Sequence, residues 1–122
     1  MHTFRPSPFT LTAAAAIGEG FGVKCTASEA CNVTGDGEGT LLLGITTDAV
    51  ASGSPVAILD RKTPGLVQLR AHAGIAAAAP IYCAAAGRFD DAASGEIVGI
   101  AVTAATNQDD LFWAFLFGAS TD

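Results

Sequence analysis

The sequence is poor in basic residues and has no long apolar run. Six of its 122 residues are Lys or Arg, against twelve Asp or Glu, and the formal net charge is -6 at pH 7. Because such a surface repels phosphate groups over most of its area, binding to nucleic acid is disfavoured. No stretch approaches the ~20 apolar residues of a membrane-spanning helix, so we expect no membrane segment.

Residues for common metal, redox and catalytic sites are also scarce. The three cysteines, Cys25, Cys31 and Cys83, lack the C-x-x-C spacing of zinc and redox sites. Free, mostly buried thiols in a reducing compartment are expected, with a Cys25–Cys31 disulfide as the alternative. There is no G-x-S-x-G motif, and His72 has no partner motif, so we interpret it as a solvated or hydrogen-bonded histidine. We predict no enzymatic activity, no cofactor and no metal site.

The sequence does contain enough apolar material for one compact core. Half of the residues are hydrophobic and only 15% are charged. A chain of this length and composition is too apolar for a disordered protein and lies within the usual size of one domain. We therefore expect one folded domain.

Two segments of the chain resemble each other. Residues 6–17 align without a gap over residues 64–75, and at the same offset Cys25 falls over Cys83. The alanine-rich N-terminal stretch superficially resembles a signal peptide. We reject that interpretation, because a removable targeting segment has no reason to match an internal one.

The repeat predicts the organisation of the chain. Each half is expected to run as strand, turn, strand, loop, short strand, loop and strand. We predict an N-terminal arm over residues 1–8 and a single β domain over residues 9–122. The repeat halves lie at about 9–59 and 67–117.

Alternating apolar and polar residues predict strands in equivalent places. Residues 67–73 and 9–14 both alternate with period two, which is typical of half-buried strands. The alanine runs 13–16 and 76–79 favour helix by propensity alone. The second run aligns with a segment that contains two glycines, and Pro80 follows it, so a turn between strands is favoured. The predicted class is all-β.

The segment 111–117 is apolar on both faces if it forms a strand. One face carries Leu111, Trp113, Phe115 and Phe117, and the other carries Phe112, Ala114 and Leu116. The core of a small β domain covers one face, and a neighbouring subunit is the favoured cover for the second. We predict Phe112, Trp113 and Leu116 as residues of an oligomer interface.

The second half resembles a known family. Residues 79–89, residues 96–105 and the apolar closing strand are similar to the head decoration proteins of tailed bacteriophages, also called capsid cement or stabilisation proteins. The resemblance implies a small β-barrel or β-clip-like domain, built here from two repeated β segments. It also implies a homotrimer on the outside of the assembled head that bridges subunits of the major capsid protein and stabilises the shell.

The same resemblance implies where the protein acts and which residues contact the capsid. The expected location is the exterior of the virion, after synthesis in the cytoplasm of the host bacterium. In the N-terminal arm, we predict capsid contacts at Phe4, Arg5, Pro6 and Pro8. The alternative is a β-clip-like module that binds a small ligand or carbohydrate. A small lyase or hydrolase is a third candidate, and it requires His72 in a cleft beside a carboxylate.

Overall fold

The computed structural model describes residues 9–27, 30–61 and 65–117, whose regular structure is mainly β-strand. The strands are β1 (Phe9–Ala13), β2 (Gly22–Ala27), β3 (Ala30–Val33), β4 (Gly44–Thr46), β5 (Pro55–Asp60), β6 (Val67–Arg70), β7 (Pro80–Cys83), β8 (Phe89–Asp90), β9 (Ile97–Ala101) and β10 (Leu111–Leu116). Two short 3-10 helices, η1 (Gly39–Leu41) and η2 (Ala85–Gly87), lie in loops. The predicted all-β class is confirmed.

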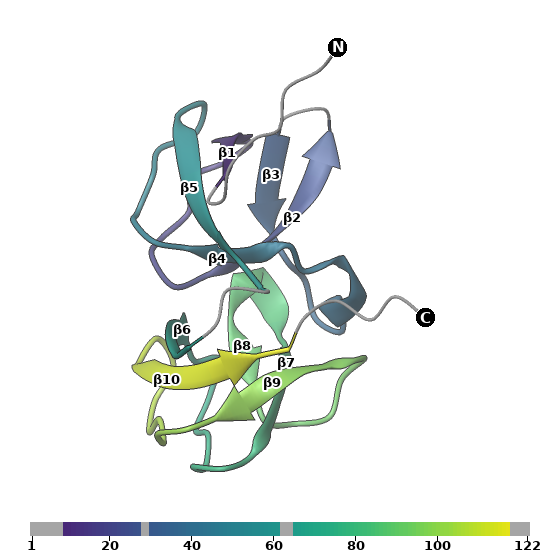
Figure 1. Ribbon diagram of the computed structural model, residues 1–122, viewed down its shortest axis with the longest axis vertical. Helices are drawn as coiled ribbons and strands as arrows, with labels where there is room; N and C mark the ends of the chain where they lie inside the picture. The colour runs from purple at the N-terminus through teal and green to yellow at the C-terminus, as the bar shows by residue number, and fades with distance from the viewer. Residues whose placement is uncertain (1–8, 28–29, 62–64, 118–122) are drawn as a thin grey trace.

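The ten strands form two five-stranded sheets, one from each half of the chain. The first closes into a barrel in the order β1-β3-β2-β4-β5, and the second has the order β6-β10-β9-β7-β8. Strands β6 to β10 thus take the places of β1 to β5, except that the parallel β1–β3 pair corresponds to a single parallel bridge between Ala71 and Phe89. Figure 1 shows the barrel above the second sheet along the longest axis of the molecule.

Both halves make the same turn after their first strand. An isolated β-bridge closes each turn, Ile17 to Val50 in the first half and Ile75 to Ala105 in the second. Gly20 and Ala78 occupy the same place in these turns, with φ angles of 82° and 70°. An L-residue with a Cβ pays about 1–2 kcal/mol for this left-handed conformation, which glycine adopts freely. The prediction that residues 76–79 form a turn is confirmed, and neither alanine run is helical, since Ala13 ends β1.

The barrel and the second sheet share a hydrophobic core. The larger cluster of buried side chains joins Leu42 and Ile45 of the first half to Phe89, Phe112 and other residues of the second. A smaller cluster lies within the barrel. Large apolar side chains contribute about 1.5–3 kcal/mol each when fully buried, so the shared cluster is a principal reason why the two sheets pack together.

A buried arginine strengthens the junction between the sheets. Arg61 follows β5 and is only 3% exposed. Its Nε donates to the carbonyl oxygen of Phe117 at 2.9 Å, and its Nη1 donates to those of Gly39 at 2.9 Å and Leu42 at 3.2 Å. These bonds tie the end of β10 to the loop around η1.

Candidate interaction surface

Strand β10 has one buried face and one open face. Phe112 and Ala114 point into the core and are 1% and 0% exposed, because the larger cluster of buried side chains packs against this face of the strand. The alternate residues Leu111, Trp113 and Phe115 point outward and are 38–49% exposed. Because successive side chains of a strand point to opposite faces, this segment places a row of large apolar side chains on the outer surface of the second sheet.

Neighbouring strand β9 extends this row into a wider patch. Ile100 pairs with Phe115, and the amide of Val102 donates to the carbonyl oxygen of Trp113 at 2.8 Å. We call the resulting surface the apolar face, and it consists of Ile97, Ile100, Val102, Leu111, Trp113, Phe115 and Phe117, all at least 38% exposed. Contiguous apolar surface of this kind marks a site of interaction with another molecule.

A shallow groove adjoins the apolar face where the two sheets meet. It has a volume of about 220 Å³, and its lining includes Trp113, Leu66, Gln68, Thr47 and Glu19. The groove is smaller than the roughly 300–1,000 Å³ of typical small-molecule sites. It thus extends the interaction surface more readily than it encloses a ligand.

A second cleft contains the histidine that the sequence singled out. His72 lines a space of about 300 Å³ together with Asp36, Asp90 and Ser94. The histidine Nδ1 has no hydrogen-bond partner among the described residues, whereas Asp36 accepts a bond from Ser94 and Asp90 from the Asp91 amide. A catalytic base needs a group that orients it, and neither carboxylate does so here. In the described part of the chain no group of three acidic, cysteine or histidine residues could hold a metal ion.

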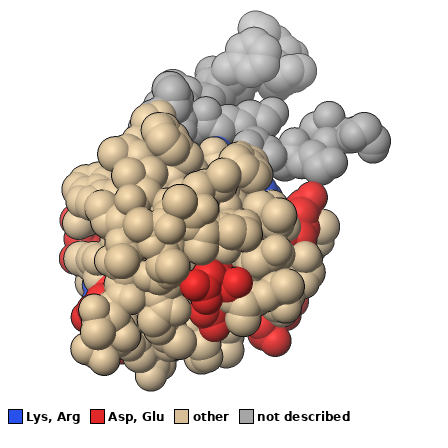
Figure 2. Space-filling model, turned by 90° about the horizontal axis from the view of Figure 1, so that it is seen from below, with Lys and Arg blue, Asp and Glu red and all other residues tan. Residues whose placement is uncertain are grey.

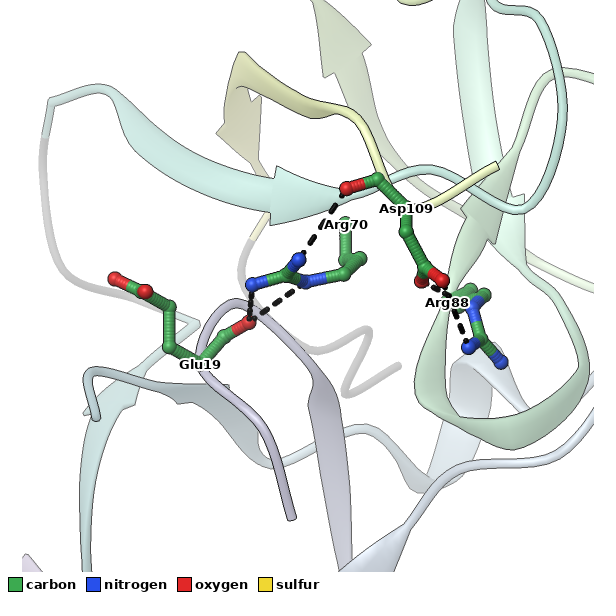
Figure 3. A network of polar contacts seen from close by, with 4 residues as sticks. All are labelled: Glu19, Arg70, Arg88 and Asp109. Carbon is green, nitrogen blue, oxygen red and sulfur yellow. Dashed lines mark hydrogen bonds and ion pairs between the residues drawn. The ribbon is translucent and has the colours of Figure 1, made fainter. Parts of the chain in front are cut away.

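Two arginines of the second half form a polar network with the barrel (Figure 3). Arg70 donates from Nε and Nη2 to the carbonyl oxygen of Glu19 at 3.1 and 3.0 Å, and from Nη1 to that of Asp109 at 3.3 Å. Arg88 holds the Asp109 carboxylate with bonds of 2.7 and 3.3 Å, which lowers the pKa of Asp109. Both guanidinium carbons lie 5.4 Å from the ring centre of Phe21. The network joins the two sheets beside the groove.

Each basic side chain that the structure describes forms hydrogen bonds or an ion pair with other residues of the same chain. Besides Arg61, Arg70 and Arg88, Lys24 forms an ion pair of 2.7 Å with Glu38. Hydrogen bonds from Lys24 and from the Gly35 amide lower the pKa of the Glu38 carboxyl. Figure 2 shows the lower end of the molecule, where the surface is mostly uncharged and the visible charged side chains are mainly acidic. The described residues thus present no basic surface for an anionic polymer.

The predicted site residues fall into three groups. Phe4, Arg5, Pro6 and Pro8 lie outside the described residues, so the predicted capsid contact stays a prediction. Trp113 is exposed, as an interface residue must be, and Leu116 is half-buried against the larger core cluster. Phe112 requires a correction, because at 1% exposure it belongs to the core of the protomer and cannot meet a neighbour.

Leu111 and Phe115 replace Phe112 on the candidate surface. The sequence could have identified both residues, because in a strand over residues 111–117 they lie on the same face as Trp113. This alternation of faces does not say which face is covered by the core. The packing of the shared core cluster against one face of β10 decides it.

Comparison with known proteins supplies the remaining evidence. A family model described as "Phage cement protein" matches residues 5–116. No curated protein matches the chain. Among solved structures, the fold is similar to the head fiber gp8.5 N base of bacteriophage phi29, with a TM-score of 0.73 and 13% identity over 93% of this chain and 96% of that one. At this identity the likeness shows the fold alone. Within the described residues no helix is long and apolar enough to cross a membrane.

Proposed function

Because the chain belongs to the phage cement protein family, we propose that it binds the outer surface of a phage capsid and stabilises the assembled head. Family membership and the fold shared with a head fiber base support a capsid-associated structural role. The observation that carries the proposal is the match of the family model over residues 5–116, which covers nearly all of the chain. The family also suggests that the protein is not an enzyme.

We further propose that the protein acts as a homotrimer in which the apolar face lies between copies. Leu111, Trp113 and Phe115 lie on one face of the same strand and are 38–49% exposed, so a second copy of the chain could shield them from water. The acidic surface would repel packaged DNA, so of the two main components of a phage head the protein shell is the proposed partner.

The N-terminal arm is the proposed contact with the major capsid protein. Its sequence offers an aromatic side chain in Phe4, a positive charge in Arg5 and two prolines that restrict the backbone, Pro6 and Pro8. Three such arms in one trimer would engage several capsid subunits at once. Multivalent attachment raises the total affinity above that of each arm and resists separation of the subunits.

The test is binding to expanded, undecorated heads of the phage that encodes the protein. Purified protein is mixed with these heads, and the bound fraction is measured by sedimentation. We expect saturable binding and a higher temperature of shell rupture for decorated heads. A chain without residues 1–8 should bind less while keeping its oligomeric state. Failure of the full chain to bind such heads would exclude the proposed function.

The groove beside Trp113 favours one alternative, a site for a small ligand or carbohydrate. Trp113 lies there next to the polar side chains of Gln68, Thr47 and Glu19, an arrangement that sugar-binding surfaces share. The small volume of the groove argues against this role. Calorimetric titration with mono- and oligosaccharides distinguishes it, since only the alternative predicts heat of binding that is lost in Trp113→Ala.

A further inference from the structure

Two of the three cysteines lie opposite each other in the barrel. Strands β2 and β3 pair antiparallel (Figure 1). In this pairing Cys25 lies directly across from Cys31, and Val23 lies across from Val33. Cys31 is completely buried, whereas Cys25 is exposed at the end of the barrel. An exposed thiol therefore adjoins a buried one on the neighbouring strand.

Backbone hydrogen bonds show which type of antiparallel pair the two cysteines form. The carbonyl of Val23 accepts from the amide of Leu43, so the odd-numbered residues of β2 direct their backbone groups toward β4 and away from β3. The carbonyl of Cys31 accepts from the amide of Ala14, so Cys31 directs its own toward β1. The Cys25–Cys31 pair therefore exchanges no backbone hydrogen bond. Such pairs bring their Cα atoms to about 4.5 Å.

This separation matches what a disulfide requires. Bridged cysteines have Cα atoms about 4.4–6.8 Å apart, and directly opposite side chains project from the same face of a sheet. Val23 and Cys31 belong to the same buried cluster, and Cys25 lies two residues beyond Val23 on the same face. The Cys25 thiol donates a hydrogen bond of 3.2 Å to the carbonyl oxygen of Ala27, so rotation about its side chain would exchange this contact for Cys31.

We propose that Cys25 and Cys31 are a cross-strand dithiol that a low-molecular-weight disulfide, such as oxidised glutathione, converts to an intramolecular disulfide. The exposed Cys25 thiolate attacks one sulfur of oxidised glutathione, forms a mixed disulfide and releases one reduced glutathione. The Cys31 thiolate then attacks the Cys25 sulfur and releases the second. The two protein thiols lose two hydrogens in total, and one oxidised glutathione becomes two reduced molecules.

The burial of the cysteines decides their roles in this reaction. Burial raises the pKa of Cys31, so it is the resolving thiol and Cys25 the attacking one. Cys83 lies in the core of the second half, where burial raises its pKa to about 11, and it serves as an unreactive internal reference.

The disulfide would fix β2 to β3 at one end of the barrel. Strand β3 also pairs with β1, so the bond would strengthen the part of the barrel that β1, β3 and β2 form. The strand register, the backbone hydrogen bonds and the burial of Cys31 support this disulfide, and none of them depends on the proposed function.

The test uses the purified full-length chain. The reduced protein is incubated with oxidised glutathione at mildly alkaline pH, unreacted thiols are alkylated after denaturation, and intact mass and peptide mapping locate the modifications. We expect a mass lower by two hydrogen atoms, a Cys25–Cys31 cross-linked peptide and alkylation of Cys83 alone. The oxidised form should have an unfolding constant about 50-fold lower, the chain-entropy value for so short a loop.

The variant Cys25→Ser is the matched control, because it alters an exposed thiol and leaves the core intact. It should give neither the cross-link nor the stabilisation, while remaining as stable as the reduced wild-type protein. A glutathione adduct that persists on Cys25, a dimer linked through two Cys25 residues, or a bond that includes Cys83 would each overturn the proposal.

Discussion

Phe115 provides the sharpest test of the apolar face, and Phe112 is its control on the same strand. Phe115 is 49% exposed, so about half of the roughly 200 Å² of a phenylalanine side chain is left for a partner to cover. At ~25 cal/mol/Å², this area is worth about 2.5 kcal/mol per contact. Phe115→Thr, which keeps a good strand former, should therefore weaken association about 60-fold per contact.

The same substitution should leave the protomer almost unchanged. We expect Phe115→Thr to lower the free energy of unfolding by no more than about 1 kcal/mol, because the side chain lies on the surface. Phe112→Ala should lower it by about 3–5 kcal/mol, because it opens a cavity in the shared core. Urea unfolding at low protein concentration measures the first quantity, and sedimentation velocity over a concentration series measures the association.

Unchanged association of the Phe115→Thr variant would contradict this assignment of the apolar face. If this variant forms the same oligomer as the wild-type chain, with a dissociation constant within threefold, then the outer surface of β10 is not the contact between copies. A wild-type chain that stays monomeric at all concentrations would remove the self-association while leaving the capsid as the only candidate to cover this face.

Three further predictions concern stability. Ala78→Gly should raise the free energy of unfolding by about 0.5–1 kcal/mol, because it relieves a positive φ, whereas Ala77→Gly in the same turn should lower it by a similar amount; thermal unfolding of both variants compares them. Arg61→Met should lower it by about 3–5 kcal/mol in urea titrations, since three backbone carbonyls lose their donor, and an unchanged midpoint would contradict this account. The pKa of Asp109 is depressed in the folded state by Arg88, so its contribution is present above the unfolded pKa and is lost as the pH falls through the lower folded value. The stability difference between the wild-type chain and Asp109→Asn should therefore be largest near neutral pH and should shrink below about pH 4; a difference that is constant with pH would count against the ion pair.

Local patterns in the sequence predicted the main strands correctly. The alternating residues 67–73 and the apolar segment 111–117 correspond to β6 and β10. The comparison of the two halves correctly excluded helix in both alanine runs and predicted the turn at residues 76–79. Strands β3 and β8 were missed and read as loop, because they are four and two residues long and carry too little alternation to be recognised.

The sequence by itself determined the strand-rich class, the acidic surface, the lack of catalytic motifs and the presence of an apolar closing segment. These properties follow from composition and from periodicity within a few residues. Only the tertiary structure decided that Phe112 is covered and Phe115 is open, that Arg61 is buried, and that Cys25 lies across from Cys31. The first two depend on how the two sheets pack against each other, and the third depends on the register between β2 and β3. No local pattern encodes contacts between segments that are distant in the sequence.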